Sequence, residues 1–193
     1  MHIAIEGLDG AGKTSAAKGL AEELGYVFQE CPIYELVSRQ GVTHFLGNLK
    51  QIDGNLHTDI AAMFFGVGNL YLRQIGQEKN VVTDRHLCAT YLWNINKDNM
   101  PVFDFLAKAC GKPDLTIILY AEAWARKKRI MERNPHDSDL DENIFTDEKY
   151  EKALEFVKRY NMKYIWLDNT YLNIQQTVEE IKKACCELLP LTL

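Results

Sequence analysis

Short apolar runs alternate along the chain with longer runs in which apolar and polar residues are mixed. The short runs are rich in Val, Ile, Leu and Tyr, which is typical of buried strands, and the longer runs repeat apolar residues at helical spacing. The strands that this pattern predicts cover residues 1–5, 26–29, 80–84, 114–119 and 164–167. Because helical segments separate the strands, we expect an α/β fold with a five-stranded parallel sheet and helices on both faces.

The clearest predicted helix covers residues 59–75. Its apolar residues recur at helical spacing, namely Ile60, Phe64, Val67, Tyr71 and Ile75. Farther along the chain, the basic helix AWARKKRIMER should stop near Asn134, because Pro135 lacks a backbone donor and crowds the preceding turn.

The segment that follows the basic helix, residues 133–149, is polar and acidic. This composition predicts an excursion over the carboxyl edge of the sheet, where open α/β sheets bind their ligands. We therefore expect a lid at about residues 134–143, within a single domain that spans residues 1–193.

Composition and charge narrow the possible classes of protein. With 193 residues, of which 47% are hydrophobic and 25% charged, the chain resembles an ordinary soluble protein. Its apolar runs are shorter than a membrane span, and no signal peptide precedes the first strand, so we expect a cytoplasmic protein without a membrane partner. The net charge of −5 argues against a nucleic-acid-binding surface. Five cysteines without metal-ligand spacing predict reduced thiols.

The segment GLDGAGKTS, residues 7–15, contains the spacing G-x-x-x-x-G-K-[ST] of a Walker A motif, or P-loop. It follows the strand-like HIAIE and precedes the helix-forming SAAKGLAEELG, which is the context that the motif requires. Glycine-rich backbone N–H groups and the helix N-terminus bind phosphate in this motif, while Lys13 reaches the β- and γ-phosphates and Thr14 ligates Mg²⁺. The predicted nucleotide-binding residues are Gly7, Gly10, Ala11, Gly12, Lys13, Thr14 and Ser15.

Charged residues near two other predicted elements favour phosphoryl transfer. Asp84 and Arg85 lie at the carboxyl end of the third strand, where the carboxylate can hold a Mg²⁺-bound water and the guanidinium can reach the transferred group. On the basic helix, Arg126, Arg129 and Arg133 recur at i, i+3 and i+7, so we expect them to share one face directed at a common point.

A GTP-binding switch is disfavoured by the residues that should read guanine. Such a switch needs Asn-Lys-x-Asp after a strand, and the nearest match, NKDN at residues 96–99, ends in Asn and follows no predicted strand. No D-x-x-G follows the third strand either. The sequence therefore favours a transferase over a switch.

The motifs EGLDGAGKT, DRH, PDLTIIL and RIMER, followed by a short lid, resemble those of thymidylate kinases and, more distantly, deoxynucleoside kinases of the P-loop superfamily. The similarity runs in order from Ile3 to about Tyr160, and the P-loop and DRH are its specific parts. It implies a P-loop kinase fold and transfer of the γ-phosphate of ATP to dTMP with Mg²⁺, in nucleotide biosynthesis. It also implies a homodimer formed through the second and third helices.

The resemblance also implies roles for individual residues. Asp9 corresponds to the P-loop carboxylate that contacts the 3′-hydroxyl of the acceptor, and Lys13, Thr14, Asp84 and Arg85 match the phosphate and magnesium positions. One branch of the family carries a P-loop arginine where this chain has Gly10. The other branch places its catalytic arginine near the lid, and the residues expected to replace it here are Arg129 and Arg133.

The chain departs from the family at the acceptor site. Gln29 stands in place of the arginine that binds the dTMP phosphate, and Gly68 or Asn69 stands in place of a second arginine. Phe64 or Phe65 remains available to stack on a base, unless both belong to the core.

These departures leave the acceptor open between two classes. A deoxynucleoside acceptor needs a general base for its 5′-hydroxyl, and Glu30 is placed to act as one. With dTMP as acceptor, Glu30 is a structural partner instead, and Arg39 or Arg73 is the candidate for the missing phosphate contact. We place the nucleotide kinase first and the nucleoside kinase second, ahead of other small-acceptor kinases and of a non-catalytic nucleotide-binding module.

Overall fold

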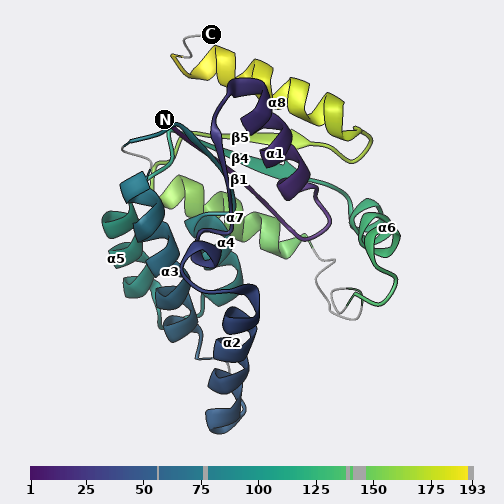
Figure 1. Cartoon of the computed structure of the whole chain (residues 1–193). Helices are drawn as coiled ribbons and strands as arrows, with labels where there is room; N and C mark the ends of the chain where they lie inside the picture. Colours follow the sequence, from purple (N-terminus) through teal and green to yellow (C-terminus); the bar gives the residue numbers. More distant parts are fainter. Residues whose placement is uncertain (56, 76–77, 138–139, 141–146, 191–193) are drawn as a thin grey trace.

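A five-stranded parallel sheet forms the centre of the computed structural model, which describes residues 1–55, 57–75, 78–137, 140 and 147–190 (Figure 1). The strands lie in the order β2-β3-β1-β4-β5. Their bounds are β1 His2–Gly7, β2 Val27–Glu30, β3 Val81–Asp84, β4 Leu115–Tyr120 and β5 Tyr164–Asp168. The α/β class and all five expected strands are confirmed, and the largest shift is at the end of β1, from residue 5 to residue 7.

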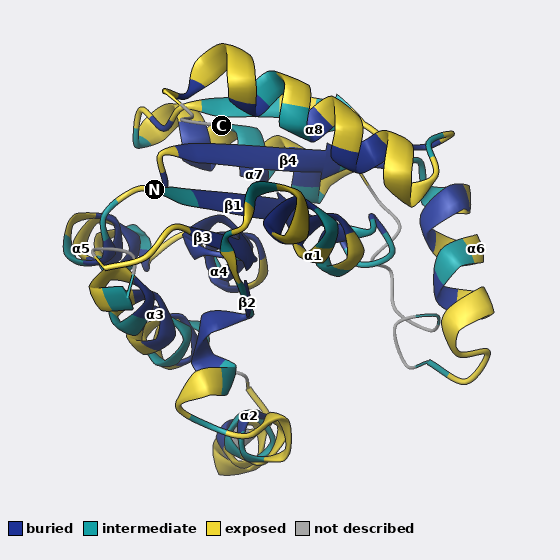
Figure 2. Ribbon diagram, turned by 45° about the horizontal axis from the view of Figure 1, so that its top comes forward, coloured by how far each residue is buried: buried dark blue, intermediate teal, exposed yellow. Residues whose placement is uncertain are grey.

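Helices cover both faces of this sheet. Figure 2 shows α1 and α8 on one face and α4 and α7 on the other, with α3 and α5 outside α4. The helices, including the 3₁₀ helix η1, are α1 Lys13–Leu24, η1 Pro32–Glu35, α2 Arg39–Asp53, α3 Thr58–Ile75, α4 Leu87–Asn94, α5 Met100–Cys110, α6 Ala123–Arg133, α7 Glu148–Arg159 and α8 Ile174–Leu188. None of the described helices is long and apolar enough to cross a bilayer.

Alternate side chains of the central strands build two separate core clusters. On β4, Ile117 packs with the residues of α1 and α8, whereas its neighbour Ile118 packs with those of α4 and α7. Both faces of the sheet are therefore buried under helices. Because neither face meets solvent, the central strands are continuous apolar runs and do not alternate apolar with polar residues. This arrangement leaves the carboxyl edge of the sheet as the place where polar side chains gather.

The helix predicted at residues 59–75 is confirmed as α3, but its repeated apolar residues are not its buried face. Ile60 and Val67 are about half exposed, at 47% and 49%. The buried face consists of smaller residues, because α3 lies close against η1: a Cβ on Gly68 would meet the backbone nitrogen of Ile33 at 2.4 Å. Close backbone packing, rather than large apolar side chains, fixes the orientation of this helix.

Helix α6 ends at Arg133, directly before the residues that the sequence predicted as its stop. Asn134 caps the last turn through its backbone N–H to the Ile130 carbonyl, and Pro135 follows. The lid expected at residues 134–143 lies partly outside the described residues, because residues 138–139 and 141–143 are not described. The five cysteines are free thiols, and four of them are buried.

Candidate active site

The P-loop connects β1 to α1 in the conformation that its glycines predict. Gly7, Gly10 and Gly12 have φ angles of 142°, 81° and 91°, and Gly12 is the residue that precedes α1. A groove of about 680 Å³ opens over the loop and is lined by Asp9, Gly10, Gly12, Lys13, Thr14 and Ser15, among others. The first N–H groups of α1 have no partner within the helix, so the groove suits an anion.

Gly10 also lets α6 pack directly on the loop. A Cβ at this position would lie 2.5 Å from the backbone oxygen of Arg126. Any larger residue at position 10, including the P-loop arginine that one branch of the family carries there, would push α6 off the loop. Gly7 and Ala11 are buried behind the groove.

The ammonium group of Lys13 is almost fully enclosed, with 5% of the residue exposed. It donates to the Leu8 carbonyl at 2.8 Å and lies 3.4 Å from Asp9 Oδ1. Burial lowers the pKa of Lys13 below its ordinary value, although the nearby Asp9 opposes the shift. The loop therefore holds its lysine extended along its own backbone, at the floor of the groove.

Asp9 also binds Arg85, which reaches it from the end of β3. Arg85 Nη2 lies 2.7 Å from Asp9 Oδ1. Burial alone would raise the pKa of Asp9, but the charges of Lys13 and Arg85 lower it to about 2. Arg85 has a φ of 79°, which is unusual for a residue other than glycine, so the surrounding structure must hold this turn in place.

Glu6 supplies part of that support. Its carboxylate accepts the backbone N–H groups of His86 at 2.9 Å and Ala89 at 3.2 Å, at the start of α4. Glu6 is fully buried, and burial raises its pKa to about 7 even though the His86 N–H opposes the rise. Glu6 was not among the residues predicted for the site. Its signal is a lone carboxylate inside the apolar strand HIAIEG.

The two residues expected at the magnesium site are in contact. Thr14 Oγ1 donates a hydrogen bond to Asp84 Oδ2, while Asp84 Oδ1 is buried and has no hydrogen-bond partner among the described residues. Carboxylate and hydroxyl oxygens are the ligands that Mg²⁺ prefers, and phosphates and water supply the rest of its octahedron in kinases. The residues present therefore fit Mg²⁺. No larger cluster of metal-ligating side chains occurs in the described part of the chain.

The three arginines of α6 do not point at one place, so that expectation was wrong. Arg126 is fully buried, and its Nε donates to the Ala121 carbonyl at 3.0 Å. It also lies 3.7 Å from Asp147, on the side of α6 that faces the protein interior. Because α6 packs tightly on Gly10, its first arginine is enclosed rather than directed at a ligand.

Arg129 ties the P-loop to the loop that follows β5. Its Nη1 donates to the carbonyls of Gly10 and Ala11, both at 3.5 Å, and to Asn169 Oδ1 at 3.2 Å. Its Nη2 donates to the Asn169 carbonyl at 2.7 Å and to the Thr170 carbonyl at 3.3 Å. Asn169 closes the ring by donating to the Ala11 carbonyl at 2.7 Å.

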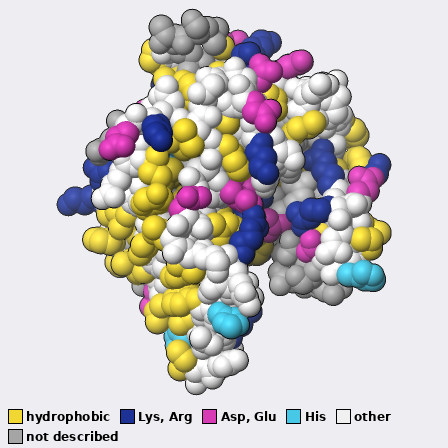
Figure 3. Space-filling model, viewed as in Figure 1, with side chains coloured by type: hydrophobic (Ala, Val, Ile, Leu, Met, Phe, Trp, Pro, Cys, Tyr) yellow, Lys and Arg dark blue, Asp and Glu magenta, His cyan; other side chains and the backbone are white. Residues whose placement is uncertain are grey.

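Arg133 lies one turn beyond Arg129 and is exposed. It pairs with Asp137 at 2.5 Å, and it lines the same groove as Arg129. Figure 3 shows Lys and Arg side chains gathered between α1 and α6 on this face, whereas the side of α3 and α5 is largely hydrophobic. The positive charge that an acidic chain needs for an anionic ligand is therefore local.

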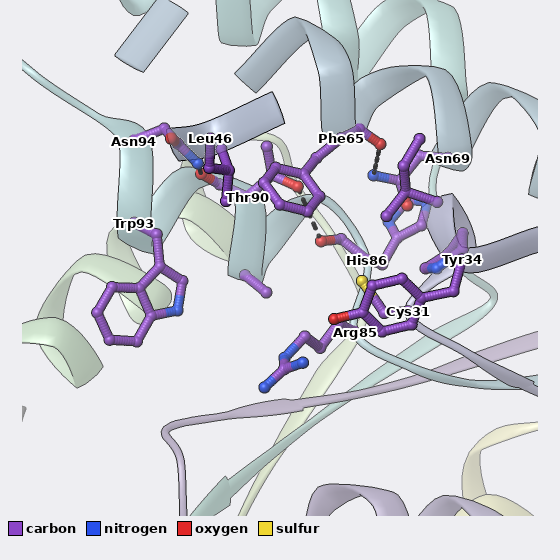
Figure 4. A pocket seen from close by; sticks show the side chains of 13 residues that line it. Cys31, Tyr34, Leu46, Phe65, Asn69, Arg85, His86, Thr90, Trp93 and Asn94 are labelled. Carbon is purple, nitrogen blue, oxygen red and sulfur yellow. Dashed lines mark hydrogen bonds between the residues drawn. The ribbon is translucent and has the colours of Figure 1, made fainter. Parts of the chain in front are cut away.

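A second cavity, of about 290 Å³, lies between η1, α3 and α4 (Figure 4). It is mostly apolar, and its lining residues are Cys31, Pro32, Ile33, Tyr34, Leu46, Phe65, Asn69, Arg85, His86, Ala89, Thr90, Trp93 and Asn94. Of the two candidate aromatics, Phe65 lines this cavity, whereas Phe64 stacks on Phe45 with ring centroids 4.0 Å apart. The structure therefore places Phe65 and not Phe64 at the cavity.

The residues proposed to replace the missing arginines lie in different places. Arg39 forms an ion pair with Glu30 and lies over the ring of Tyr34, 4.7 Å from its centroid, beside the cavity. Arg73 donates to the Ala109 carbonyl at 2.5 Å, at the far end of α3. Arg39 is therefore near the cavity and Arg73 is not.

Comparison with known proteins decides the family. The family model for thymidylate kinase matches residues 44–181. The chain belongs to the thymidylate kinase family. The kinase is 30% identical to the thymidylate kinase of Mycoplasma capricolum, over 98% of this chain and 96% of the relative. It is 27% identical to a putative adenylate kinase of Pyrococcus abyssi, over 94% of this chain and 82% of that protein.

The fold agrees with this assignment. The deoxyadenosine kinase of M. mycoides superimposes on this kinase with a TM-score of 0.67 and 18% identity, over 97% of this chain and all of that one. The expected P-loop kinase fold is confirmed. The expected class of enzyme, a nucleoside monophosphate kinase of the thymidylate kinase type, is confirmed by the family model and by the thymidylate kinase relative. Membership of this class makes ATP the phosphoryl donor.

Proposed function

We propose that this kinase transfers the γ-phosphoryl group of ATP to the phosphate of a deoxynucleoside monophosphate, with dTMP as the preferred acceptor. The observation that carries the proposal is the position of Arg85, which lines both the groove over the P-loop and the cavity beside α3. A donor in the groove and an acceptor in the cavity would meet at this guanidinium. Its charge suits the oxygens of a group in transit between them.

In this proposal, different residues of the chain bind the phosphates, the metal ion and the acceptor. Lys13 neutralises the β- and γ-phosphate oxygens from the floor of the groove, and the N–H groups of the loop, from Gly10 to Ser15, bind the phosphates. Thr14 and Asp84 would hold Mg²⁺, Asp84 through a water, and the ion would neutralise negative charge on the phosphates. Asp9 orients Arg85 and contacts the 3′-hydroxyl of the acceptor.

A phosphate on the acceptor is supported by Arg39. Its ion pair with Glu30 holds a guanidinium at the end of β2, on the ring of Tyr34, which lines the cavity. Arg39 and Arg85 together supply the positive charge that Gln29 and Asn69 no longer provide. An ionised phosphate acceptor needs no general base, so an arginine-paired Glu30 is compatible with it.

Closure of the lid completes the proposed site. Arg133 is exposed at the end of α6 and pairs with Asp137 in the first described part of the lid, residues 134–143. Closure brings Arg133 toward the phosphates and excludes water from them. In this proposal residues 1–193 form one kinase domain, and the compartment is the cytoplasm.

A deoxynucleoside acceptor is the second candidate, because Glu30 lines the phosphate groove together with Asp9 and Arg85. In that case Glu30 takes the proton of the 5′-hydroxyl, a role that typically contributes ~10²–10⁴-fold to the rate. Glu30→Gln would then lower turnover about a hundredfold or more. A fall of less than about tenfold, with activity confined to monophosphates, supports the first candidate.

The deciding experiment is a coupled ADP-release assay with ATP and Mg²⁺ over the four deoxynucleosides and their monophosphates. We expect turnover of monophosphates and none of nucleosides. Turnover of nucleosides alone would replace the proposal with the nucleoside kinase. Absence of turnover on both sets would overturn both candidates.

We also propose that the kinase is a homodimer that pairs through α3. The exposed apolar residues Ile60, Met63, Val67 and Leu70 recur at steps of three and four, so they form one stripe along the helix. Contiguous apolar surface of this kind marks an interaction site in soluble proteins. A second copy of the chain presents the same stripe, which suits a two-fold interface.

A further inference from the structure

Asn169 connects the P-loop to α6 through a single buried amide. The residue directly follows β5, lines the groove over the P-loop and is 3% exposed. Its Nδ2 donates to the Ala11 carbonyl in the P-loop at 2.7 Å, and its Oδ1 accepts from Arg129 Nη1 on α6 at 3.2 Å. Both ends of the amide are therefore paired, and each hydrogen bond crosses to a different element of the fold.

The two partners determine which side chain can stand between them. The Ala11 carbonyl can only accept a hydrogen bond, and the Arg129 guanidinium can only donate one. The side chain at position 169 must therefore donate at one end and accept at the other. Asparagine meets both requirements, whereas the near-isosteric aspartate has no donor when ionised, and leucine has neither group.

The backbone of Asn169 is fixed to the sheet. Its N–H donates to the Tyr120 carbonyl, at the end of β4, at 2.9 Å, and its carbonyl accepts from Arg129 Nη2 at 2.7 Å. Strand β4 lies between β1 and β5, so it borders both the strand before the P-loop and the strand before Asn169. The amide therefore ties a glycine-rich loop, whose own backbone is conformationally permissive, to a fixed point outside it.

The hydrogen bond to Ala11 sets the direction of the next N–H group in the P-loop. In a trans peptide, the C=O of one residue and the N–H of the following residue point in opposite directions, and no cis peptide occurs among the described residues. Because the Ala11 carbonyl points at Asn169, the Gly12 N–H points away from it. Gly12 lines the groove and directly precedes α1, so its N–H has no partner within that helix and suits a phosphate oxygen.

We propose that Asn169 is a positioning residue for the phosphates of ATP. It holds the peptide between Ala11 and Gly12 so that the Gly12 N–H faces the phosphates, and it holds Arg129 against the same loop. The inference rests on the proposed function only where that function places the phosphates of ATP in the groove over the P-loop. It does not depend on the class of acceptor, so the test uses whichever acceptor supports turnover.

The variant Asn169→Leu removes both side-chain hydrogen bonds without adding a charge. We expect KM for ATP to rise by about tenfold or more, with kcat and KM for the acceptor within about threefold of the wild type, because the lost contact binds the phosphates equally before and during transfer. A merely structural role would lower the active fraction, and with it the apparent kcat, without changing KM. An unchanged KM for ATP in the folded variant would overturn the proposal.

Inorganic tripolyphosphate separates the phosphates of ATP from its base and sugar. This probe carries the charged phosphate chain alone and is measured as a competitive inhibitor against ATP. Its Ki should rise in Asn169→Leu by about the same factor as KM for ATP. A raised KM for ATP with an unchanged Ki for tripolyphosphate would mean that Asn169 acts on the nucleoside part of ATP, which would contradict the proposal.

Asn99→Leu is the matched control, because it makes the same exchange at another buried asparagine. Asn99 is 5% exposed; its Nδ2 donates to the Asn94 carbonyl at 2.9 Å, and its Oδ1 accepts the Asn96 N–H at 3.0 Å. It belongs to the start of α5 and does not line the groove over the P-loop. The control should lose stability and keep the wild-type KM for ATP. An equal rise of this KM in both variants would assign the effect to general loss of packing and overturn the proposal.

The second variant, Asn169→Asp, separates the two hydrogen bonds and also serves if the leucine variant does not fold. Its carboxylate still accepts from Arg129, but it turns an oxygen toward the Ala11 carbonyl. KM for ATP should therefore rise at least about tenfold here too, and a wild-type value would overturn the role of the bond to Ala11. A wild-type enzyme that binds neither ATP nor tripolyphosphate would instead overturn the proposed function, and the inference with it.

Discussion

The carboxylate of Glu6, inside β1, accepts the backbone N–H of His86 at a distance of 2.9 Å. The same carboxylate also accepts the N–H of Ala89, so it caps α4 from a different element of the fold. Between β3 and this cap lies Arg85, in a left-handed conformation. Glu6 therefore fixes the turn that aims the proposed phosphate-binding arginine.

This relationship makes stability depend on pH through Glu6. Its pKa is about 7 in the folded chain, against an ordinary value of 4.5, so the folded chain keeps the proton over a range where the unfolded chain has lost it. The free energy of unfolding should then fall as pH rises through this range, by up to about 1.4 kcal/mol per pH unit, and level off above it. Urea denaturation of the wild type and of Glu6→Gln, at several pH values, measures the effect.

The difference between the two proteins isolates Glu6, since Gln does not titrate. The charged groups that act on Glu6 are Lys13, Asp84 and Arg85, and they are present in both proteins. Burial lowers the pKa of His2 to about 4, and its contribution is also common to both. A difference that stays constant from pH 4.5 to 7 would show that Glu6 has no raised pKa.

Lys13→Met should remove most of the activity and little of the stability. The ammonium is desolvated by burial, as its lowered pKa indicates, so an apolar chain of similar length is tolerated there. Without its charge, kcat should fall by about 10²–10³-fold, as for other preorganised electrostatic contacts. Turnover is measured by ADP release and stability by thermal denaturation. Near-wild-type turnover would exclude the proposed role of Lys13.

The elements that the sequence predicted well are those fixed by local pattern. The five strands and the P-loop follow from apolar runs and from glycines that need positive φ, and both are decided within a few residues. The side chains on α3 were harder to assign. Phe64 and Phe65 are adjacent in the sequence, and the fold separates them: Phe64 packs on Phe45, whereas Phe65 lines the cavity.

The error on α6 has the same physical origin. Helical spacing places Arg126, Arg129 and Arg133 on neighbouring positions of one helix, but it does not say how closely that helix packs on the rest of the protein. Gly10 lets α6 touch the P-loop near Arg126, so the first arginine is enclosed and the last is exposed. Such a contact joins residues more than a hundred positions apart and has no local signal.

The proposed dimer should dissociate when the apolar stripe of α3 receives a charge. In Val67→Glu, a carboxylate would be buried against its own copy across the interface, which is strongly unfavourable. Light scattering after size-exclusion chromatography should show a dimer for the wild type and a monomer for this variant. Val27→Glu is the matched control, because Val27 is 40% exposed and belongs to β2, not to the apolar stripe of α3. A wild-type protein that is monomeric at high concentration would contradict the proposed dimer.

Replacement by Met should have different effects at Arg129 and at Arg133: the first should lower stability, and the second should lower kcat. Arg129→Met leaves backbone carbonyls of the P-loop and of the loop after β5 without their donor, so the free energy of unfolding should fall by about 1–3 kcal/mol and KM for ATP should rise. Arg133→Met removes an exposed ion pair, which should change stability by less than about 0.5 kcal/mol while lowering kcat. Urea denaturation and steady-state kinetics of both variants test this division. If Arg133→Met leaves kcat unchanged, the lid does not act through this residue.

Gly10→Ala tests whether close packing of α6 on the P-loop is required. Alanine at a φ of 81° is strained, and its Cβ would lie 2.5 Å from the Arg126 carbonyl, so the loop and α6 must separate. Gly25→Ala is the matched control: its φ is also positive, at 65°, but nothing lies within 4 Å of the added Cβ. The free energy of unfolding of the control should fall only by the cost of placing alanine in the left-handed region, about 1–2 kcal/mol, and its KM for ATP should not change.

Gly10→Ala should lose clearly more stability than Gly25→Ala, and its KM for ATP should rise at least about tenfold, because Arg129 loses its carbonyl partners on the P-loop when α6 moves away. Urea denaturation gives the first quantity and ATP titration at saturating acceptor gives the second. Equal loss of stability in the two variants would mean that α6 adjusts freely over the loop. In that case the P-loop arginine that one branch of the family carries would fit at position 10 as well. The placement of the catalytic charge on α6 would then not follow from the close contact between Gly10 and Arg126.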